Sequence, residues 1–234
     1  MVEPDLRPGP SLVGRRSIRH WTPNYVSHRV RALVDHWRDP HAPSLTKDAT
    51  RLLGQLLAGS DQGVEWGSGN STAWLAERTK HLTSFETNPE YFARVREGLR
   101  SRDITNVDYR LIPFQDSDSE EEMLRSEWVQ SASAFIDDSL DFVLVDSSPR
   151  GCLCAQVAGK LRRGGILVLD NANWYLPPPR WLTPAPGSVS VPLGFQGSRV
   201  PESTMWPRFL DETKRWRRIW TSDGVQMTLV FIKT

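Results

Sequence analysis

The chain has 234 residues, enough for one α/β domain with its own core but few for two independent domains. Hydrophobic residues at 38% and charged residues at 24% are typical of a globular protein and exclude a disordered tail or a disulfide-held mini-protein. The 29 Lys and Arg residues nearly balance the 28 Asp and Glu residues. Such a chain has no global field that would draw it onto nucleic acid, so we expect no nucleic-acid partner.

The cysteines and the apolar segments indicate the cellular compartment in which the protein is expected. Cys152 and Cys154 lie too close in sequence to favour a mutual disulfide and are too few for a zinc site, so we expect reduced thiols. Residues 1–10 contain no apolar core of signal-peptide length, and no stretch approaches the roughly 20 apolar residues of a membrane span. We therefore expect a cytoplasmic protein without a membrane partner, and the sequence leaves a homo-oligomer open.

Residues 1–60 have a helical pattern, from which we expect an N-terminal helical cap. Apolar residues recur at intervals of three and four in two segments, separated by Pro40 and Pro43. The first segment contains Tyr25, Val26, Val30, Leu33, Val34 and Trp37, and the second contains Leu45, Ala49, Leu52, Leu53, Leu56 and Leu57.

From Gly63 onward, short β runs alternate with amphipathic helices, which predicts a parallel sheet with crossover helices. In chain order we expect a strand over 63–66, a helix over 71–80, a strand over 81–86, a helix over 89–100 and a strand over 107–112. Ser119 lies three residues before Glu122, a capping-box spacing that predicts a helix N-terminus in the acidic run 116–122.

The C-terminal half continues this alternation and ends in a hairpin. We expect a strand over 140–145, a helix over 152–161, a strand over 166–169, a helix over 208–214 and strands over 217–221 and 225–232. Residues 222–224, Ser-Asp-Gly, predict a tight turn, so one of the last two strands must run antiparallel to the rest of the sheet. The segment 177–201 is rich in Pro, Gly and Ser, and we expect it to form a lid within an insertion at about 172–204.

A glycine loop follows the first of these strands. Gly67 and Gly69 allow a tight turn and a close approach of a ligand to the backbone. Glu86 ends the next strand 21 positions after Glu65, the spacing at which a carboxylate meets a ribose diol in nucleotide-binding βαβ units. A dinucleotide loop would have a third glycine where this chain has Thr72, so we favour an adenosyl ligand with an amino-acid end over a pyrophosphate.

Residues 65–71, EWGSGNS, resemble the first motif of the class I methyltransferases that use S-adenosylmethionine. Glu86 resembles their ribose-binding acid, and residues 161–168, LRRGGILV, resemble the turn into their fifth strand. The resemblance covers about residues 63–234 and implies a methyltransferase domain over residues 61–234 with a Rossmann-like three-layer α/β/α fold, whose mostly parallel seven-stranded sheet has an antiparallel C-terminal strand. It also implies that the following residues bind S-adenosylmethionine: Glu65, Gly67, Ser68, Gly69, Ser71 and Glu86.

A finer resemblance concerns Asp146 and the pair Asp170 and Asn171, which follow two apolar strands. These residues are similar to the metal-binding residues of catechol-type and caffeoyl-type O-methyltransferases, which implies a divalent ion such as Mg²⁺. Those enzymes carry a lysine where this chain has Pro149, and the adjacent Arg150 is too basic to be a general base. Arg150 could instead clamp an anionic substrate group. Metal binding, substrate orientation or proton transfer by a carboxylate, and strand-end capping all stay open.

These observations predict a methyltransferase that uses S-adenosylmethionine and methylates a small-molecule oxygen, such as a sugar or natural-product hydroxyl. The predicted catalytic residues are Asp146, Arg150, Asp170 and Asn171. Two alternatives share the βαβ unit: an NAD-dependent oxidoreductase and a non-catalytic nucleotide-binding module.

Overall fold

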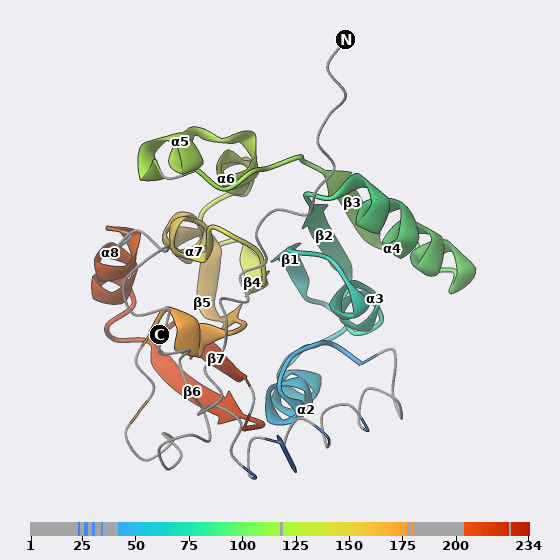
Figure 1. The fold of residues 1–234 in the computed structure, drawn as a ribbon, viewed down its shortest axis with the longest axis horizontal. Coiled ribbons are helices and arrows are strands. Elements are labelled where there is room, and N and C mark those ends of the chain that lie inside the picture. The colour runs from blue at the N-terminus through green and yellow to red at the C-terminus, as the bar shows by residue number, and fades with distance from the viewer. Residues whose placement is uncertain are drawn as a thin grey trace.

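A seven-stranded sheet forms the centre of the computed structural model, with strand order β3-β2-β1-β4-β5-β7-β6 (Figure 1). The structure describes residues 42–117, 119–176, 204–224 and 226–234, together with residues 23, 26, 27, 30, 34 and 179. The first five strands are parallel: β1 (Gln62–Trp66), β2 (His81–Glu86), β3 (Val107–Leu111), β4 (Leu140–Val145) and β5 (Leu161–Leu169). β7 (Met227–Ile232) runs antiparallel between β5 and β6 (Arg217–Ser222), which confirms the predicted sheet and C-terminal hairpin.

Helices cover both faces of the sheet, giving three layers (Figure 1). One face carries α2 (Lys47–Leu56), α3 (Asn70–Ala76) and α4 (Pro89–Ser101). The other face carries α5 (Glu120–Arg125), α6 (Glu127–Gln130), α7 (Arg150–Val157) and α8 (Met205–Glu212). Short 3-10 turns follow three elements: η2 (Ser131–Ala134), η3 (Ala158–Lys160) and η4 (Ala172–Trp174). Within the described residues, no helix combines the length and the apolar composition that crossing a bilayer requires.

The central strands are apolar on both sides because each side packs against helices. In β4, Val143 and Val145 belong to the core under α5 to α8, whereas Phe142 and Leu144 belong to the core under α2 and α3. Cys152 and Cys154 are buried free thiols in α7, in accordance with the expected reduced state.

Several boundaries differ from the sequence prediction. α8 begins at Met205 rather than Arg208, because Pro207 lies in the first turn, where proline is tolerated. β5 begins at Leu161 rather than Ile166, and its pairing with β4 shifts register between Leu140 and Phe142. A Cβ at Gly165 would lie 2.8 Å from the Arg162 carbonyl oxygen, so this irregular strand needs glycine there. α7 begins earlier than expected, at Arg150, and the predicted helix from Ser119 is present with Ser119 as its N-cap.

The N-terminal region is described in part. Residues 23, 26, 27, 30 and 34 of the first expected helix are helical, and α2 contributes Leu45, Ala49 and Leu53 to the core that contains Val230 of β7. The Thr46 side chain caps α2, and its hydroxyl lies 2.5 Å from the Thr221 hydroxyl of β6. The division of the chain at residue 60 stays a prediction. The predicted lid over 177–201 lies outside the described residues, except for residue 179.

Candidate functional site

The glycine loop turns sharply at the end of β1. Gly67 has a φ of +97°, and a Cβ there would lie 2.9 Å from the backbone carbon and oxygen of Asp146. The Gly67 amide donates to the Phe85 carbonyl at 3.0 Å. Gly69 caps α3, and its amide donates to the Thr72 hydroxyl at 3.0 Å. Gly67 therefore lets the ends of β1, β2 and β4 meet in a way that a side chain would prevent.

Glu65 lies beneath this loop and is fully buried. Its carboxylate accepts hydrogen bonds from the hydroxyls of Ser71 at 2.5 Å, Thr72 at 2.6 Å and Ser84 at 2.7 Å. Burial raises its pKa to about 7, even though these hydroxyl donors favour the ionised form. Glu65 and Ser71, both predicted to bind cofactor, thus contact each other, and the three hydroxyls hold the carboxylate against the start of α3.

Glu86 ends β2 on the other side of the loop. Its Oε1 atom accepts the backbone amides of Thr87 at 2.8 Å and Asn88 at 2.9 Å. Its Oε2 atom accepts the Ser68 hydroxyl of the glycine loop at 2.5 Å. The side chain is thus fixed through one oxygen, and the other oxygen faces the loop. The structure brings Ser68 and Glu86 into contact, as their assignment to one site requires.

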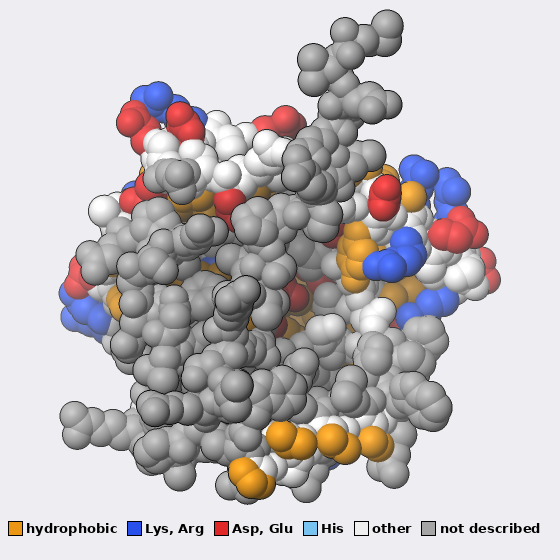
Figure 2. Space-filling model, viewed as in Figure 1, with side chains coloured by type: hydrophobic (Ala, Val, Ile, Leu, Met, Phe, Trp, Pro, Cys, Tyr) orange, Lys and Arg blue, Asp and Glu red, His pale blue; other side chains and the backbone are white. Residues whose placement is uncertain are grey.

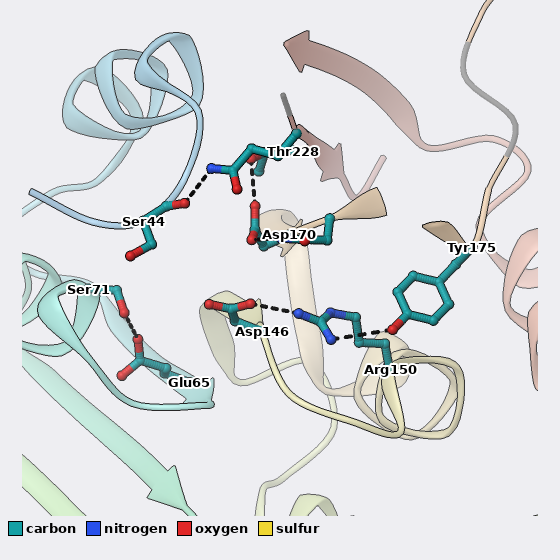
Figure 3. Close-up of polar contacts among 10 residues, drawn as sticks. Ser44, Glu65, Ser71, Asp146, Arg150, Asp170, Tyr175 and Thr228 are labelled. Atoms are coloured by element: carbon teal, nitrogen blue, oxygen red, sulfur yellow. Dashed lines mark hydrogen bonds and ion pairs between the residues drawn. The ribbon is translucent and has the colours of Figure 1, made fainter. Parts of the chain in front are cut away.

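Asp146 and Asp170 follow the adjacent parallel strands β4 and β5, and their carboxyl groups face each other. Arg150, the first residue of α7, donates from Nη2 to Asp146 Oδ1 at 2.7 Å (Figure 3). Asp170 Oδ1 accepts the Thr228 hydroxyl of β7 at 2.9 Å. Asn171 has left-handed backbone angles, and its side-chain amide donates to Asp170 Oδ2. The predicted catalytic residues therefore lie together at one edge of the sheet.

The two carboxyl groups carry shifted pKa values. Burial, together with the negative charge of Asp146, raises the pKa of Asp170 to about 7, although Arg150 opposes the shift. Burial also raises the pKa of Asp146, against the attraction of the Arg150 guanidinium. A single arginine thus lies beside the buried Asp170 carboxyl and the partly exposed Asp146 carboxyl, and Asp170 is suited to hold a proton near neutral pH.

A divalent ion, which the finer resemblance implied for Asp146, Asp170 and Asn171, would compete with the Arg150 guanidinium, which contacts Asp146 Oδ1. The Asn171 side chain contacts Asp170 Oδ2. In the described part of the chain, no group of three or more His, Cys, Asp and Glu side chains could hold a metal ion. The fixed cation at this edge is the guanidinium.

Tyr175 borders Arg150 on the side away from Asp146 (Figure 3). Arg150 Nη1 donates to the Tyr175 hydroxyl at 3.4 Å, and the tyrosine ring lies 5.4 Å from the Trp206 ring of α8. Arg150 Nε is buried without a hydrogen-bond partner among the described residues. This N–H group is therefore unsatisfied within the described residues.

Sequence reasoning did not identify Tyr175 and Thr228 as residues of this edge. They come from the segment after β5 and from the last strand, so only the folded arrangement brings them to Arg150 and Asp170. No local motif marks either residue, although the predicted hairpin does place a strand beside β5.

The surface near this edge is mixed in charge. Figure 2 shows acidic atoms in a hollow near the centre of the view, with positive and negative side chains interspersed over the helices at the rim. Within the described residues of this face, one sign of charge does not dominate.

No protein-family model and no curated protein matches the sequence. Solved structures do match. One is a protein from Streptococcus mutans assigned as a methyltransferase, in complex with S-adenosylhomocysteine; it is 13% identical, with a TM-score of 0.53 over 82% of this chain and 99% of that chain. Another is an O-methyltransferase from Bacillus cereus, also with S-adenosylhomocysteine; it is 15% identical, with a TM-score of 0.52 over 88% of this chain and 91% of that chain.

A third structure widens the range of substrates among the similar proteins. A protein from Clostridium thermocellum assigned as an rRNA methylase is 14% identical, with a TM-score of 0.52 over 82% of this chain and 97% of that chain. At such low identity these similarities concern the fold alone. The sheet order, the loop after β1 and these matches together identify the fold as that of the class I S-adenosylmethionine-dependent methyltransferases.

Proposed function

We propose that this protein is an S-adenosylmethionine-dependent methyltransferase that methylates a hydroxyl group of a small molecule. The observation that carries the proposal is the pairing of the Gly67 turn with Glu86. The turn is compact enough for close approach of a ligand, and Glu86 is fixed through Oε1 while Oε2 faces the loop.

Different residues would bind different parts of the cofactor. Glu86 would accept hydrogen bonds from the ribose hydroxyls, and the backbone from Gly67 to Gly69 would lie against the ligand. The Ser68 hydroxyl, which lies on Glu86 Oε2, would give way to a ribose hydroxyl, whereas Glu65 and Ser71 would hold the loop from beneath. When bound, S-adenosylmethionine supplies a methyl group that is already activated, so the protein's main contribution is to orient the acceptor.

The edge formed by Asp146, Arg150 and Asp170 would receive the acceptor. A hydroxyl nucleophile must lose one proton, and Asp170, with a pKa of about 7, is matched to take it near neutral pH. Arg150 stays protonated and would stabilise negative charge on the acceptor oxygen. Asn171 and Thr228 would hold the Asp170 carboxyl in place, and we propose that the reaction proceeds without a metal.

The alternatives have less support. An NAD-dependent oxidoreductase would use a third glycine, but Thr72 is buried at that position and its hydroxyl is bonded to both Glu65 and Gly69. A non-catalytic nucleotide-binding module would not need a buried ion pair between Asp146 and Arg150 at the neighbouring edge. A nucleic-acid substrate is disfavoured by the net charge of +1.

The experiment is a transfer assay with S-adenosylmethionine labelled in the methyl group. Sugars, phenols and polyketide-like alcohols are compared with total RNA as acceptors, each with EDTA and with added Mg²⁺. We expect label on a small-molecule hydroxyl, equally with chelator and with metal. Label on RNA alone would overturn the acceptor class, and turnover that requires Mg²⁺ would overturn the metal-independent mechanism.

A further inference from the structure

Tyr109 approaches the Glu86 carboxylate from the edge strand β3. It pairs in register with Ser84 of β2, two residues before Glu86. Its hydroxyl lies 2.6 Å from the Ser68 hydroxyl, which lies 2.5 Å from Glu86 Oε2. The three side chains come from β3, the glycine loop and the end of β2, so the fold rather than a local motif brings them together.

The ring of Tyr109 is held by a neighbouring aromatic ring. It stacks on Phe92 of α4, with ring centroids 4.3 Å apart and an angle of 22° between the planes. Burial raises the pKa of Tyr109 further above its ordinary value, so the phenol keeps its proton at any physiological pH. Tyr109 therefore presents a fixed hydroxyl donor toward the loop.

The directions of the two hydrogen bonds at the Ser68 hydroxyl follow from the single proton that this hydroxyl carries. The Ser68 hydroxyl has one proton and donates it to the Glu86 carboxylate, so its oxygen is left to accept the proton of Tyr109. The bridging hydroxyl between Glu86 and Tyr109 thus donates on one side and accepts on the other. A ribose hydroxyl has the same capacity, and it could take the position that Ser68 occupies.

We propose that Tyr109 is a cofactor-binding residue that, together with Glu86, recognises a ribose hydroxyl of the adenosyl ligand. This inference rests on the proposed function, because it takes the ligand to be S-adenosylmethionine or its demethylated product. Glu86 accepts the proton of the ribose hydroxyl, and Tyr109 donates to its oxygen. A ligand that lacks this hydroxyl leaves the Tyr109 donor without its partner.

Calorimetric titration with S-adenosylhomocysteine and its 2′-deoxy and 3′-deoxy analogues tests the contact. Tyr109→Phe keeps the stack on Phe92 and removes only the hydroxyl, and we expect it to weaken S-adenosylhomocysteine binding about 2- to 12-fold, the worth of one neutral hydrogen bond. One deoxy analogue should bind the wild type at least about 10-fold more weakly, because it loses a charge-assisted bond to Glu86. That penalty should shrink about 2- to 12-fold in Tyr109→Phe.

The matched control is Tyr175→Phe, which removes a phenol hydroxyl beside Arg150 and should leave the deoxy penalty at its wild-type size. A merely structural role of Tyr109 would weaken the ligands equally, so an unchanged deoxy penalty in folded Tyr109→Phe overturns the inference. If wild-type protein binds S-adenosylhomocysteine but Tyr109→Phe binds it equally well, the inference fails and the proposed function stands. Wild-type protein that does not bind it at all overturns both.

Discussion

The acidic side chains in the two halves of the site are surrounded by different kinds of groups. At the cofactor half, Glu65 is surrounded by three hydroxyl donors, and Glu86 is fixed by two backbone amides and one hydroxyl. At the acceptor half, Asp146 and Asp170 face each other beside a single guanidinium. The acids of the first half accept from neutral donors alone, whereas those of the second half also lie beside a cation.

This difference indicates what each half can do. Neutral donors on rigid elements fix a carboxylate in one position, which suits the binding of a cofactor that is the same in every turnover. A pair of buried acids with one cation can change its protonation state, which suits a step that moves a proton. The comparison predicts that changes at the cofactor half mainly affect binding, whereas changes at the acceptor half mainly affect charge balance and stability.

The largest effect is expected at Gly67, where the two halves meet. Gly67→Val would place side-chain atoms against the Asp146 backbone at a φ of +97°, so we expect binding of S-adenosylhomocysteine to be lost. Calorimetry measures this loss. Gly98→Ala in α4 is the control, because a Cβ there meets no atom within 4 Å, and it should bind normally. Normal binding by Gly67→Val would reject the loop as the cofactor site.

The next largest effect is expected at the ion pair of the acceptor half. Arg150→Met leaves Asp146 without its cation and should destabilise the fold by about 3 kcal/mol, the low end for buried pairs because the Asp146 side chain is 27% exposed. Asp146→Asn combined with Arg150→Met should cost less than the two single changes added together. Urea unfolding of the four proteins gives the coupling, and additive losses would mean that the pair does not act as a unit.

Glu86 offers a smaller effect, confined to the cofactor half. Glu86→Ala should weaken S-adenosylhomocysteine binding by roughly 1 to 3 kcal/mol, since charge-assisted hydrogen bonds are lost. Glu86→Gln retains a carbonyl oxygen for the amides of Thr87 and Asn88, so it separates the loss of charge from loosening of the loop. Unaltered affinity in both folded variants would show that another group accepts the ribose hydroxyls.

Counted per group and per pH unit, the smallest effect is a pH dependence of stability. The folded protein raises the pKa of Glu65 from 4.5 and that of Asp170 from 3.8 to about 7. Between these values the folded state binds more protons than the unfolded state, so the free energy of unfolding should fall as pH rises toward about 7 and then level off. Each group contributes at most about 1.4 kcal/mol per pH unit. Unfolding of wild type, Glu65→Gln and Asp170→Asn from pH 5 to 8 measures the slopes, and equal slopes in all three would contradict this origin.

The sequence predicted the cofactor half better than the acceptor half. Glycines and an acid at a fixed spacing are local signals. The alternation of strands and helices predicts that the glycine loop and Glu86 lie at the same edge of a parallel sheet, as they do in the structure. Thr228 and Tyr175 reach the acceptor half from distant segments, so their contacts depend on the packing of β7 and α8. The direction of the Arg150 side chain, which turns toward Asp146, is also a tertiary property, so the sequence could not show that a guanidinium lies beside the proposed metal ligands.

The central claim is that the edge between β1 and β2 binds an adenosyl ligand with an amino-acid end. Its most direct test is calorimetric titration of the wild-type protein, in EDTA at pH 7.5, with S-adenosylhomocysteine and, separately, with NAD⁺. We predict one saturable site for S-adenosylhomocysteine that Glu86→Ala weakens, and no binding of NAD⁺. Saturable binding of NAD⁺ without binding of S-adenosylhomocysteine would contradict the account.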